Sequence, residues 1–296
     1  MVEINILLID IDSMRGNLAL ASISAYYKLK GYKVGFNIDN PDKVYISCIF
    51  RKNKFKALGI GKMFGKGVEV HVGGSGVSWE WLPEAMQKIK PDYNLYNWDR
   101  SVGFTSRGCI RKCNWCVVPQ KEGEWEKCMH ISEFWDDRFS KVELLDNNIF
   151  VDKDWFFENT DFILDHKLKV IEHGMDVRLL DREIVERLSE MKFSSTMHFA
   201  FDDIKDEKVV RKGIALLKDA GIDIKHNVQF YVLSGFNGSI ESDKYRVRLL
   251  KKLGTNAFVM PFKIDSWTNA LARYCNRKHV YWSCDIDEYA PEFVGR

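Results

Sequence analysis

This chain contains the segment Gly103-Phe-Thr-Ser-Arg-Gly-Cys109-Ile-Arg-Lys-Cys113-Asn-Trp-Cys116-Val-Val-Pro119, in which three cysteines follow one another closely. Three thiolates so near in sequence can surround one metal centre, because a short loop brings its side chains together. They leave one coordination position without a protein ligand, and iron with such a position binds a substrate or cofactor atom. The spacing therefore predicts an open metal centre held by Cys109, Cys113 and Cys116.

Other uses of these thiols stay open on the sequence alone. A structural zinc site takes four protein ligands, and the nearest candidates for the fourth are Cys128 and His130. A non-catalytic binding module stapled by zinc would add Cys128 to the three cysteines, and an electron-transfer protein would need four cluster cysteines. A disulfide is disfavoured, because no secretory signal is recognisable and Cys48, Cys275 and Cys284 are scattered.

The segment resembles the signature of the radical S-adenosylmethionine (SAM) superfamily. The resemblance rests on the cysteine spacing, on Trp115 before the third cysteine and on the Thr-Ser-Arg-Gly before the first. It implies that Cys109, Cys113 and Cys116 hold a [4Fe-4S] cluster, whose fourth iron binds the amino and carboxylate groups of SAM. It also implies that Trp115 lies near the adenine of SAM.

The same resemblance implies an enzyme. Such enzymes pass one electron to SAM and release methionine and a 5'-deoxyadenosyl radical, which takes a hydrogen atom from a substrate that is unknown here. A one-electron reductant such as flavodoxin or ferredoxin would be a partner. No second cysteine cluster follows in the sequence, which argues against sulfur insertion of the methylthiotransferase kind.

Length and composition fit an intracellular enzyme with one large hydrophobic core or two moderate ones. The chain has 296 residues, 46% of them hydrophobic, and a formal net charge of +2. This charge is too balanced to indicate nucleic acid as a partner. No apolar run approaches the roughly 20 residues that a membrane span needs. We expect a cytoplasmic protein without a membrane partner.

The first 98 residues alternate short apolar runs with helical periodicity. Runs at 4–10, 33–36, 44–50 and 68–72 suit strands, and 17–30 suits a helix that Gly31 ends. This alternation predicts a Rossmann-like parallel sheet over residues 1–98. The turn Gly73-Gly74-Ser75-Gly76 either lets the backbone approach a phosphate or is simply tight.

Placed before a radical SAM core, this region resembles the cobalamin-binding domain of one branch of the superfamily. That resemblance implies cobalamin as a further cofactor and methyl transfer as the reaction. The family's Asp-x-His-x-x-Gly motif would fall at Asp12-Ser-Met-Arg-Gly16, where the histidine is absent and the spacing is one residue short. A degenerate domain used for packing or substrate recognition is the other interpretation.

From residue 99 to 263 strands and helices alternate again. Candidate strands lie at 102–106, 142–145, 170–172, 197–201, 227–233 and 257–260, and candidate helices include 183–191 and 206–220. About six strand–helix units predict a partial (β/α)6 barrel, the architecture that the radical SAM resemblance also implies. The aromatic segment 264–296 is expected to pack on this barrel as an extension.

Reactive groups of such barrels lie at the C-terminal ends of the strands. The polar and small residues at these ends, matched to the family's SAM contacts, are Asp146, Asn147, Arg178, Asp202, Gly235 and Met260. The resemblance implies that Asp146 and Asn147 bind the SAM amino group, and the planar fork of Arg178 suits its carboxylate. Each residue also has a structural interpretation, such as a helix cap for Asp146 or core packing for Met260.

Overall fold

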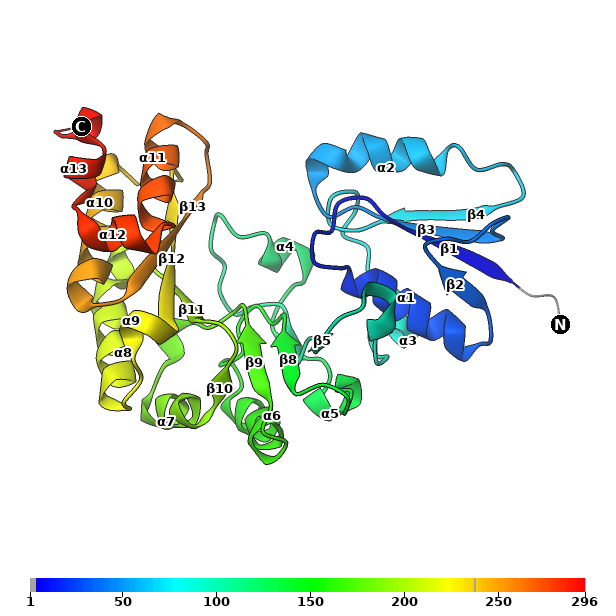
Figure 1. Cartoon of the computed structure of the whole chain (residues 1–296), viewed down its shortest axis with the longest axis horizontal. Coiled ribbons are helices and arrows are strands. Elements are labelled where there is room, and N and C mark those ends of the chain that lie inside the picture. The colour runs from blue at the N-terminus through cyan, green and yellow to red at the C-terminus, as the bar shows by residue number, and fades with distance from the viewer. Residues whose placement is uncertain (1–3, 237, 296) are drawn as a thin grey trace. The chain divides into compact units, whose positions relative to one another are not determined.

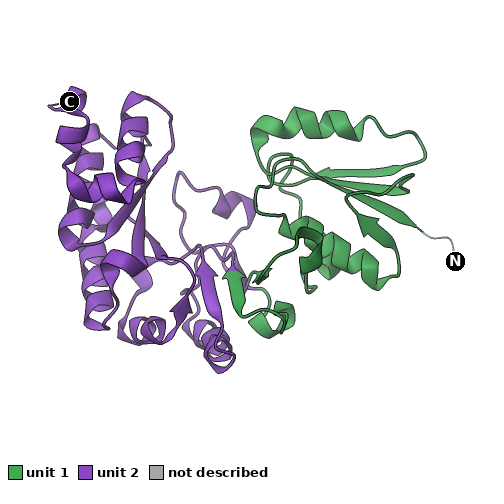
Figure 2. Cartoon of the chain, viewed as in Figure 1, with its two compact units in different colours: residues 1–104, 128–143 green, residues 105–127, 144–296 purple. Residues whose placement is uncertain are grey.

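The computed structural model describes residues 4–236 and 238–295. It shows an α/β protein in which most strands are parallel (Figure 1). The chain divides into two compact units: Met1–Phe104 with Cys128–Glu143, and Thr105–Lys127 with Leu144–Arg296 (Figure 2). The division predicted at 1–98, 99–263 and 264–296 stays a prediction. Among the residues that the structure describes, no helix is long and apolar enough to cross a membrane.

The first unit contains a parallel sheet with the strand order β2-β1-β3-β4. Its strands are β1 (Asn5–Asp10), β2 (Lys33–Gly35), β3 (Lys43–Ser47) and β4 (Glu69–Gly73). Helices α1 (Leu18–Leu29) and α2 (Lys54–Gly61) cover opposite faces of this sheet (Figure 1). Alternation along the strands explains this, because Ile6 and Leu8 pack with α1 whereas Val44 and Ile46 pack with α2.

The remaining elements of the first unit are short. They are η1 (Arg51–Asn53), α3 (Glu84–Gln87), η2 (Tyr93–Tyr96), β5 (Ser101–Gly103), α5 (Ile131–Phe134) and β8 (Lys141–Leu144), whose last residue belongs to the second unit. Gly103 explains how α5 approaches β5, because a Cβ there would lie 2.7 Å from the ring of Phe134. The Tyr93 hydroxyl donates to the carbonyl of Phe134 and fixes the same contact.

The second unit holds two sets of parallel strands and one small ladder. β9 (Lys169–Glu172) pairs with β10 (Lys192–Phe193), and β12 (Val228–Ser234) lies between β11 (Met197–Ala200) and β13 (Asn256–Pro261). β6 (Ser106–Arg107) pairs antiparallel with β7 (Glu126–Lys127). Strands lie at the predicted positions 142–145, 170–172, 197–201, 227–233 and 257–260, whereas the strand predicted at 102–106 is divided into β5 and β6. They fall into separate ladders, so a partial barrel stays a prediction.

Helices of the second unit begin mostly at polar caps. Asp152, Asp181 and Ser239 each accept a hydrogen bond from the first turn of their helix. The elements are α4 (Val118–Lys121), α6 (Lys153–Asp165), η3 (Val177–Leu179), α7 (Arg182–Glu190), η4 (Ile204–Asp206), α8 (Glu207–Asp219), α9 (Ile224–Asn227), α10 (Ile240–Leu253), α11 (Ser266–Cys275), α12 (Lys278–Ser283), α13 (Ile286–Tyr289) and η5 (Pro291–Phe293).

The aromatic C-terminal segment is part of the core of this unit. Tyr274 and Tyr281 are buried, and the Tyr281 hydroxyl donates to the carbonyl of Val247 in α10. Trp267 is also buried, and its indole N–H donates to Asp243 of α10 at 3.0 Å. These aromatic rings therefore support the helix layer beside β13, which is the packing role that is commoner for such residues than base stacking.

Candidate functional site

The three cysteines lie on a loop that is closed at its base. The β6–β7 ladder pairs Ser106 with Lys127 and Arg107 with Glu126, so the intervening residues form one excursion. Gly108 has a φ of +71°, and a Cβ there would lie 2.0 Å from the carbonyl oxygen of Glu124. Only glycine meets both conditions. The residue directly before Cys109 therefore fixes how the loop leaves its base.

Asp146 anchors the start of this loop. Its carboxylate is buried and accepts from the backbone N–H and hydroxyl of Thr105 at 3.0 and 2.6 Å, and from the backbone N–H and hydroxyl of Ser106 at 2.5 and 2.6 Å. Burial raises the pKa of the Asp146 carboxyl, while these hydrogen bonds act in the opposite direction. The carboxylate oxygens are thus used within the protein. The predicted contact of Asp146 with the SAM amino group stays a prediction.

Glu122 ties the far side of the loop to the end of β8. Its buried carboxylate accepts from the side-chain amide of Asn147 at 2.7 Å and from the backbone N–H of Gly108 at 3.3 Å. Burial alone would raise the pKa of Glu122, but the charge of Arg107 and the bond from Asn147 outweigh it and lower the pKa. Asn147 therefore lies beside the cysteine loop, as its predicted role in the site requires.

A third anchor joins the loop to the residues after β9. The Nε of Arg111 donates to Oδ2 of Asp176 at 2.8 Å, and the Nε of Arg178 donates to Oδ1 at 2.6 Å. Burial acts to raise the pKa of Asp176, but the two guanidinium groups lower it below its ordinary value. The Nη1 of Arg178 lies 3.6 Å from Asp206, and its side chain is 30% exposed. Arg178 is held at the strand end with its side chain still partly exposed.

The cysteines themselves are free and partly exposed. The backbone N–H of Arg111 donates to Sγ of Cys109 at 3.4 Å, and the backbone N–H of Cys116 donates to the carbonyl of Cys113 at 3.0 Å. Burial raises the pKa of the Cys113 thiol; Arg178 acts to lower it, and negative charge on Cys116, Cys109 and Asp202 acts to raise it further. The charges of Arg178 and Asp202 therefore act on the Cys113 thiol in opposite directions.

The donor set fits an iron-sulfur cluster. Within residues 4–236 and 238–295, no three His, Cys, Asp or Glu side chains converge to hold one metal ion. A polynuclear cluster binds each thiolate at a different iron, so its ligands surround an inorganic core instead of meeting at one point. Three free, partly exposed cysteine thiols on one loop are the ligand type that such a core takes.

Aromatic packing brings the loop to the ends of β12 and β13. The ring of Trp115 meets that of Phe236 edge to face at 5.5 Å, and Phe236 meets Phe262 in the same way at 4.8 Å. Gly235 precedes Phe236, and Met260, which is 39% exposed, lies two residues before Phe262. Trp115 thus packs on the residue that follows Gly235, and the predicted adenine contacts of Trp115, Gly235 and Met260 stay predictions.

Gly235 also has a packing reason of its own. Its φ is +81°, and a Cβ there would lie 2.9 Å from Cγ2 of Thr268 and 3.2 Å from the carbonyl oxygen of Lys263. The positive φ and this close approach both favour glycine, whether or not a ligand is bound.

Asp202 lies at the end of β11, where a buried arginine holds the backbone. The Nη1 of Arg246 donates to the carbonyls of Phe201 and Asp202 at 2.8 and 2.9 Å, and its Nη2 donates to the carbonyl of Leu233 at 2.8 Å. The Asp202 carboxylate accepts from the backbone N–H of Leu233 at 2.9 Å, and burial raises its pKa. This clamp keeps the ends of β11 and β12 together.

A polar face of the three-stranded sheet lies opposite the helices. Val228, Phe230 and Val232 of β12 are buried on the helix side, whereas Tyr231 of the other face is only half-buried. Here the ring of His198 stacks on Tyr231 at 5.0 Å, and its Nδ1 lies 3.3 Å from buried Glu172. This face offers hydrogen-bonding groups beside the predicted SAM contacts.

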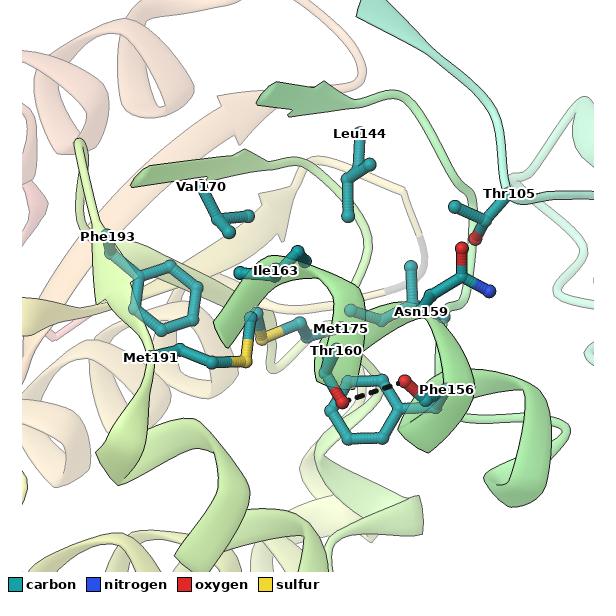
Figure 3. A pocket seen from close by; sticks show the side chains of 11 residues that line it. Thr105, Leu144, Phe156, Asn159, Thr160, Ile163, Val170, Met175, Met191 and Phe193 are labelled. Atoms are coloured by element: carbon teal, nitrogen blue, oxygen red, sulfur yellow. Dashed lines mark hydrogen bonds between the residues drawn. The ribbon is translucent and has the colours of Figure 1, made fainter. Parts of the chain in front are cut away.

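One enclosed cavity behind this region is too small for a substrate. Apolar and hydroxyl side chains of the second unit point into it (Figure 3), and its volume is about 10 Å³. That is about the space of one water molecule. Thr160 is already satisfied by a 2.9 Å hydrogen bond to the carbonyl of Phe156. The cavity is a packing feature.

In the first unit, the segment from Asp12 to Gly16, where the family's cobalamin motif would fall, begins with an aspartate that makes internal contacts. Asp12 accepts from the backbone N–H groups of Ile49 and Phe50 at 2.7 and 3.1 Å, and from the Asn53 amide at 2.9 Å. A Cβ on Gly74 would lie 2.5 Å from the carbonyl oxygen of Cys48. The glycine-rich turn therefore allows close packing on residues 48–53, which connect β3 to α2 and are called the β3 loop below. Beside it, an open cavity of about 470 Å³ follows the end of β1.

Comparison with known proteins adds no relative. No protein-family model matches the chain, and a search of curated proteins found no match.

Several residues of this site could not be recognised from sequence. Glu122 and the hydroxyls of Thr105 and Ser106 are common residue types, and nothing in their local pattern marks them as loop anchors. The one usable signal was position, because Asp146 and Asp176 follow predicted strands.

Proposed function

We propose that this chain is a radical SAM enzyme that acts on a substrate still to be identified. The observation that supports this most is the anchoring of one three-cysteine loop by three carboxylates, Asp146, Glu122 and Asp176. Such anchoring holds the thiols in place before any ligand binds, and preorganised ligands reduce the entropic cost of binding a cofactor.

In this proposal Cys109, Cys113 and Cys116 hold a [4Fe-4S] cluster. When bound, this cluster would supply the single electron that breaks a carbon–sulfur bond of SAM, with its open iron as the point of attachment. Arg178 is the side chain best suited to the SAM carboxylate, because its charge acts on Cys113 and its side chain is partly exposed. Asp176 orients Arg178 by accepting its Nε–H.

The aromatic cluster of Trp115, Phe236 and Phe262 has two tasks in this proposal. It provides an apolar surface for the adenine, and it excludes water from the side of the loop that faces β12 and β13. Asp202 accepts a ribose hydroxyl through the carboxylate oxygen that Leu233 does not use.

The strand order of the first unit supports the Rossmann-like interpretation. β2 lies on one side of β1, and β3 and β4 lie on the other, so the order reverses between β1 and β3 while the strands stay parallel. The segment from Asp12 to Gly16 contains no histidine for cobalt, and the Asp12 carboxylate is engaged with the β3 loop. We therefore propose that the first unit is a degenerate domain that does not bind cobalamin, and that the chain is not a cobalamin-dependent methyltransferase.

Anaerobic reconstitution with iron and sulfide tests the main proposal. The expected result is about three to four irons per chain, because a [4Fe-4S] cluster contains four. After reduction, the protein should release 5'-deoxyadenosine from SAM. Cys113→Ala should abolish that release, whereas Cys284→Ala, at a thiol outside the loop whose Sγ lies 3.7 Å from the carbonyl of Val280, should not. Tightly bound zinc without any SAM cleavage would favour the stapled binding module and refute the enzyme.

A further inference from the structure

The β3 loop and helix α2 carry an unusual charge distribution. From Lys43 to Val68 the sequence contains no Asp or Glu, although it contains several lysines and one arginine. The balanced net charge of +2 therefore conceals a strongly cationic segment within the first unit. A local excess of this kind, and not the total charge, determines where a polyanion binds.

The cations of this segment are available for a partner. Arg51, Lys52 and Lys56 are exposed, and in the part of the chain that the structure describes none of their side chains forms an ion pair. Lys54 differs, because its ammonium group donates to the carbonyl of Val77 at 3.2 Å. Three free cations thus line the loop and the first turn of α2.

Aromatic rings stand exposed among these cations. Phe55 is 84% exposed and Phe50 is 50% exposed, and the ammonium group of Lys52 lies 5.8 Å from the Phe50 ring centroid. Large exposed apolar rings are unfavourable in water unless a partner covers them. The backbone of Phe50 packs closely against Gly76, where a Cβ would lie only 2.7 Å from it.

Helix α2 cannot bury these rings in its own unit. Its inner face is already in contact with the sheet, since Ala57 is fully buried and a Cβ on Gly61 would lie 3.0 Å from Cγ2 of Val72. The eight-residue helix also lacks a continuous outer apolar face of the kind that an interfacial membrane helix needs. Its first turn exposes Phe55 and Lys56 side by side in the sequence.

We propose that the surface formed by Phe50, Arg51, Lys52, Phe55 and Lys56 binds single-stranded nucleic acid. The three cations neutralise successive phosphates, and the two rings stack on unpaired bases, which expose their π-faces. An acidic protein would satisfy the cations but not the rings. This binding goes beyond the proposed function and needs neither cluster nor SAM, so it is tested on the whole chain as purified.

The experiment is fluorescence anisotropy with a short labelled RNA strand of mixed sequence, its DNA counterpart and the matching duplex, over a series of salt concentrations. Both single strands should bind more tightly than the duplex. The triple variant Arg51→Glu/Lys52→Glu/Lys56→Glu should bind at least tenfold more weakly and lose about 2 units of the log–log salt slope, at about 0.7 per phosphate contact. Phe55→Ala should weaken single-strand binding about fivefold or more.

A matched control carries the same charge change elsewhere. Lys208→Glu/Lys212→Glu/Lys218→Glu alters three exposed lysines of α8 and should retain the affinity. Circular dichroism confirms that each variant is folded. Unchanged binding by the first triple variant, equal loss in the control, or binding only to phosphatidylserine vesicles would each overturn the proposal.

Discussion

The Nε of Arg111 donates a hydrogen bond to Oδ2 of Asp176 across 2.8 Å, joining the middle of the cysteine loop to the end of β9. Hydrogen bonds to charged groups contribute about 1.5–3 kcal/mol each. We expect Asp176→Asn to lower the free energy of unfolding by about 1–3 kcal/mol and to reduce the iron retained after reconstitution. Urea unfolding and iron analysis measure the two effects. Asp219→Asn, at the exposed last residue of α8, is the control and should change neither.

Acid should release the same contact. The folded-state pKa of Asp176 lies below its ordinary value of 3.8, so its ion pairs stabilise the fold above about pH 4 and are lost as the pH falls through the lowered pKa. Hydrogen exchange of the cysteine loop, measured at decreasing pH after correction for the intrinsic rate, should show protection that disappears in acid. The Asp176→Asn protein should lack this transition. If both proteins lose protection at the same pH, another group controls the loop.

Asp146 should be more important for stability than its single side chain suggests. Asp146→Ala would leave the backbone N–H groups of Thr105 and Ser106 without acceptors in a buried site, and each costs about 1–3 kcal/mol. We expect a clear fall in the denaturation midpoint. Thr105→Val removes only one hydroxyl donor and should cost less. Equal effects of the two changes would mean that Asp146 does not carry the anchor.

The contact between Trp115 and Phe236 should affect SAM binding. Phe236→Ala removes an aromatic pair worth about 0.5–1.5 kcal/mol and opens the side of the loop that faces β12. We expect weaker SAM binding to the reconstituted protein with an unchanged iron content, measured by equilibrium dialysis. Phe236→Leu keeps the apolar volume and should recover part of the affinity. A loss of iron instead would indicate that the aromatic pair supports the cysteines themselves.

Gly235 separates backbone strain from side-chain crowding. Gly235→Ala combines a φ of +81° with a Cβ 2.9 Å from Cγ2 of Thr268, whereas Gly221→Ala has a φ of +79° and open space. The left-handed conformation alone costs about 1–2 kcal/mol, so Gly235→Ala should destabilise more than Gly221→Ala. Adding Thr268→Ser to Gly235→Ala removes the crowding methyl group and should restore part of the difference in thermal unfolding.

Much of the secondary structure was predictable because it depends on local patterns. The spacing of apolar residues correctly predicted helices α1, α7 and α8. It also predicted strands β1 to β4, β8, β9, β11, β12 and β13. The two-residue strands β6, β7 and β10 were not predicted, since so short a strand shows no periodic pattern. The cysteine spacing likewise identified the candidate site without any coordinates.

The sequence by itself thus determined the alternation of strands and helices, the three candidate ligands and the acid-free cationic segment, because each is a local property of the chain. Only the tertiary structure decided which groups these residues meet. Asp146 reaches Thr105 across 41 positions and Arg111 reaches Asp176 across 65. The partner of a buried charge is set by packing between distant segments, and no local pattern encodes it.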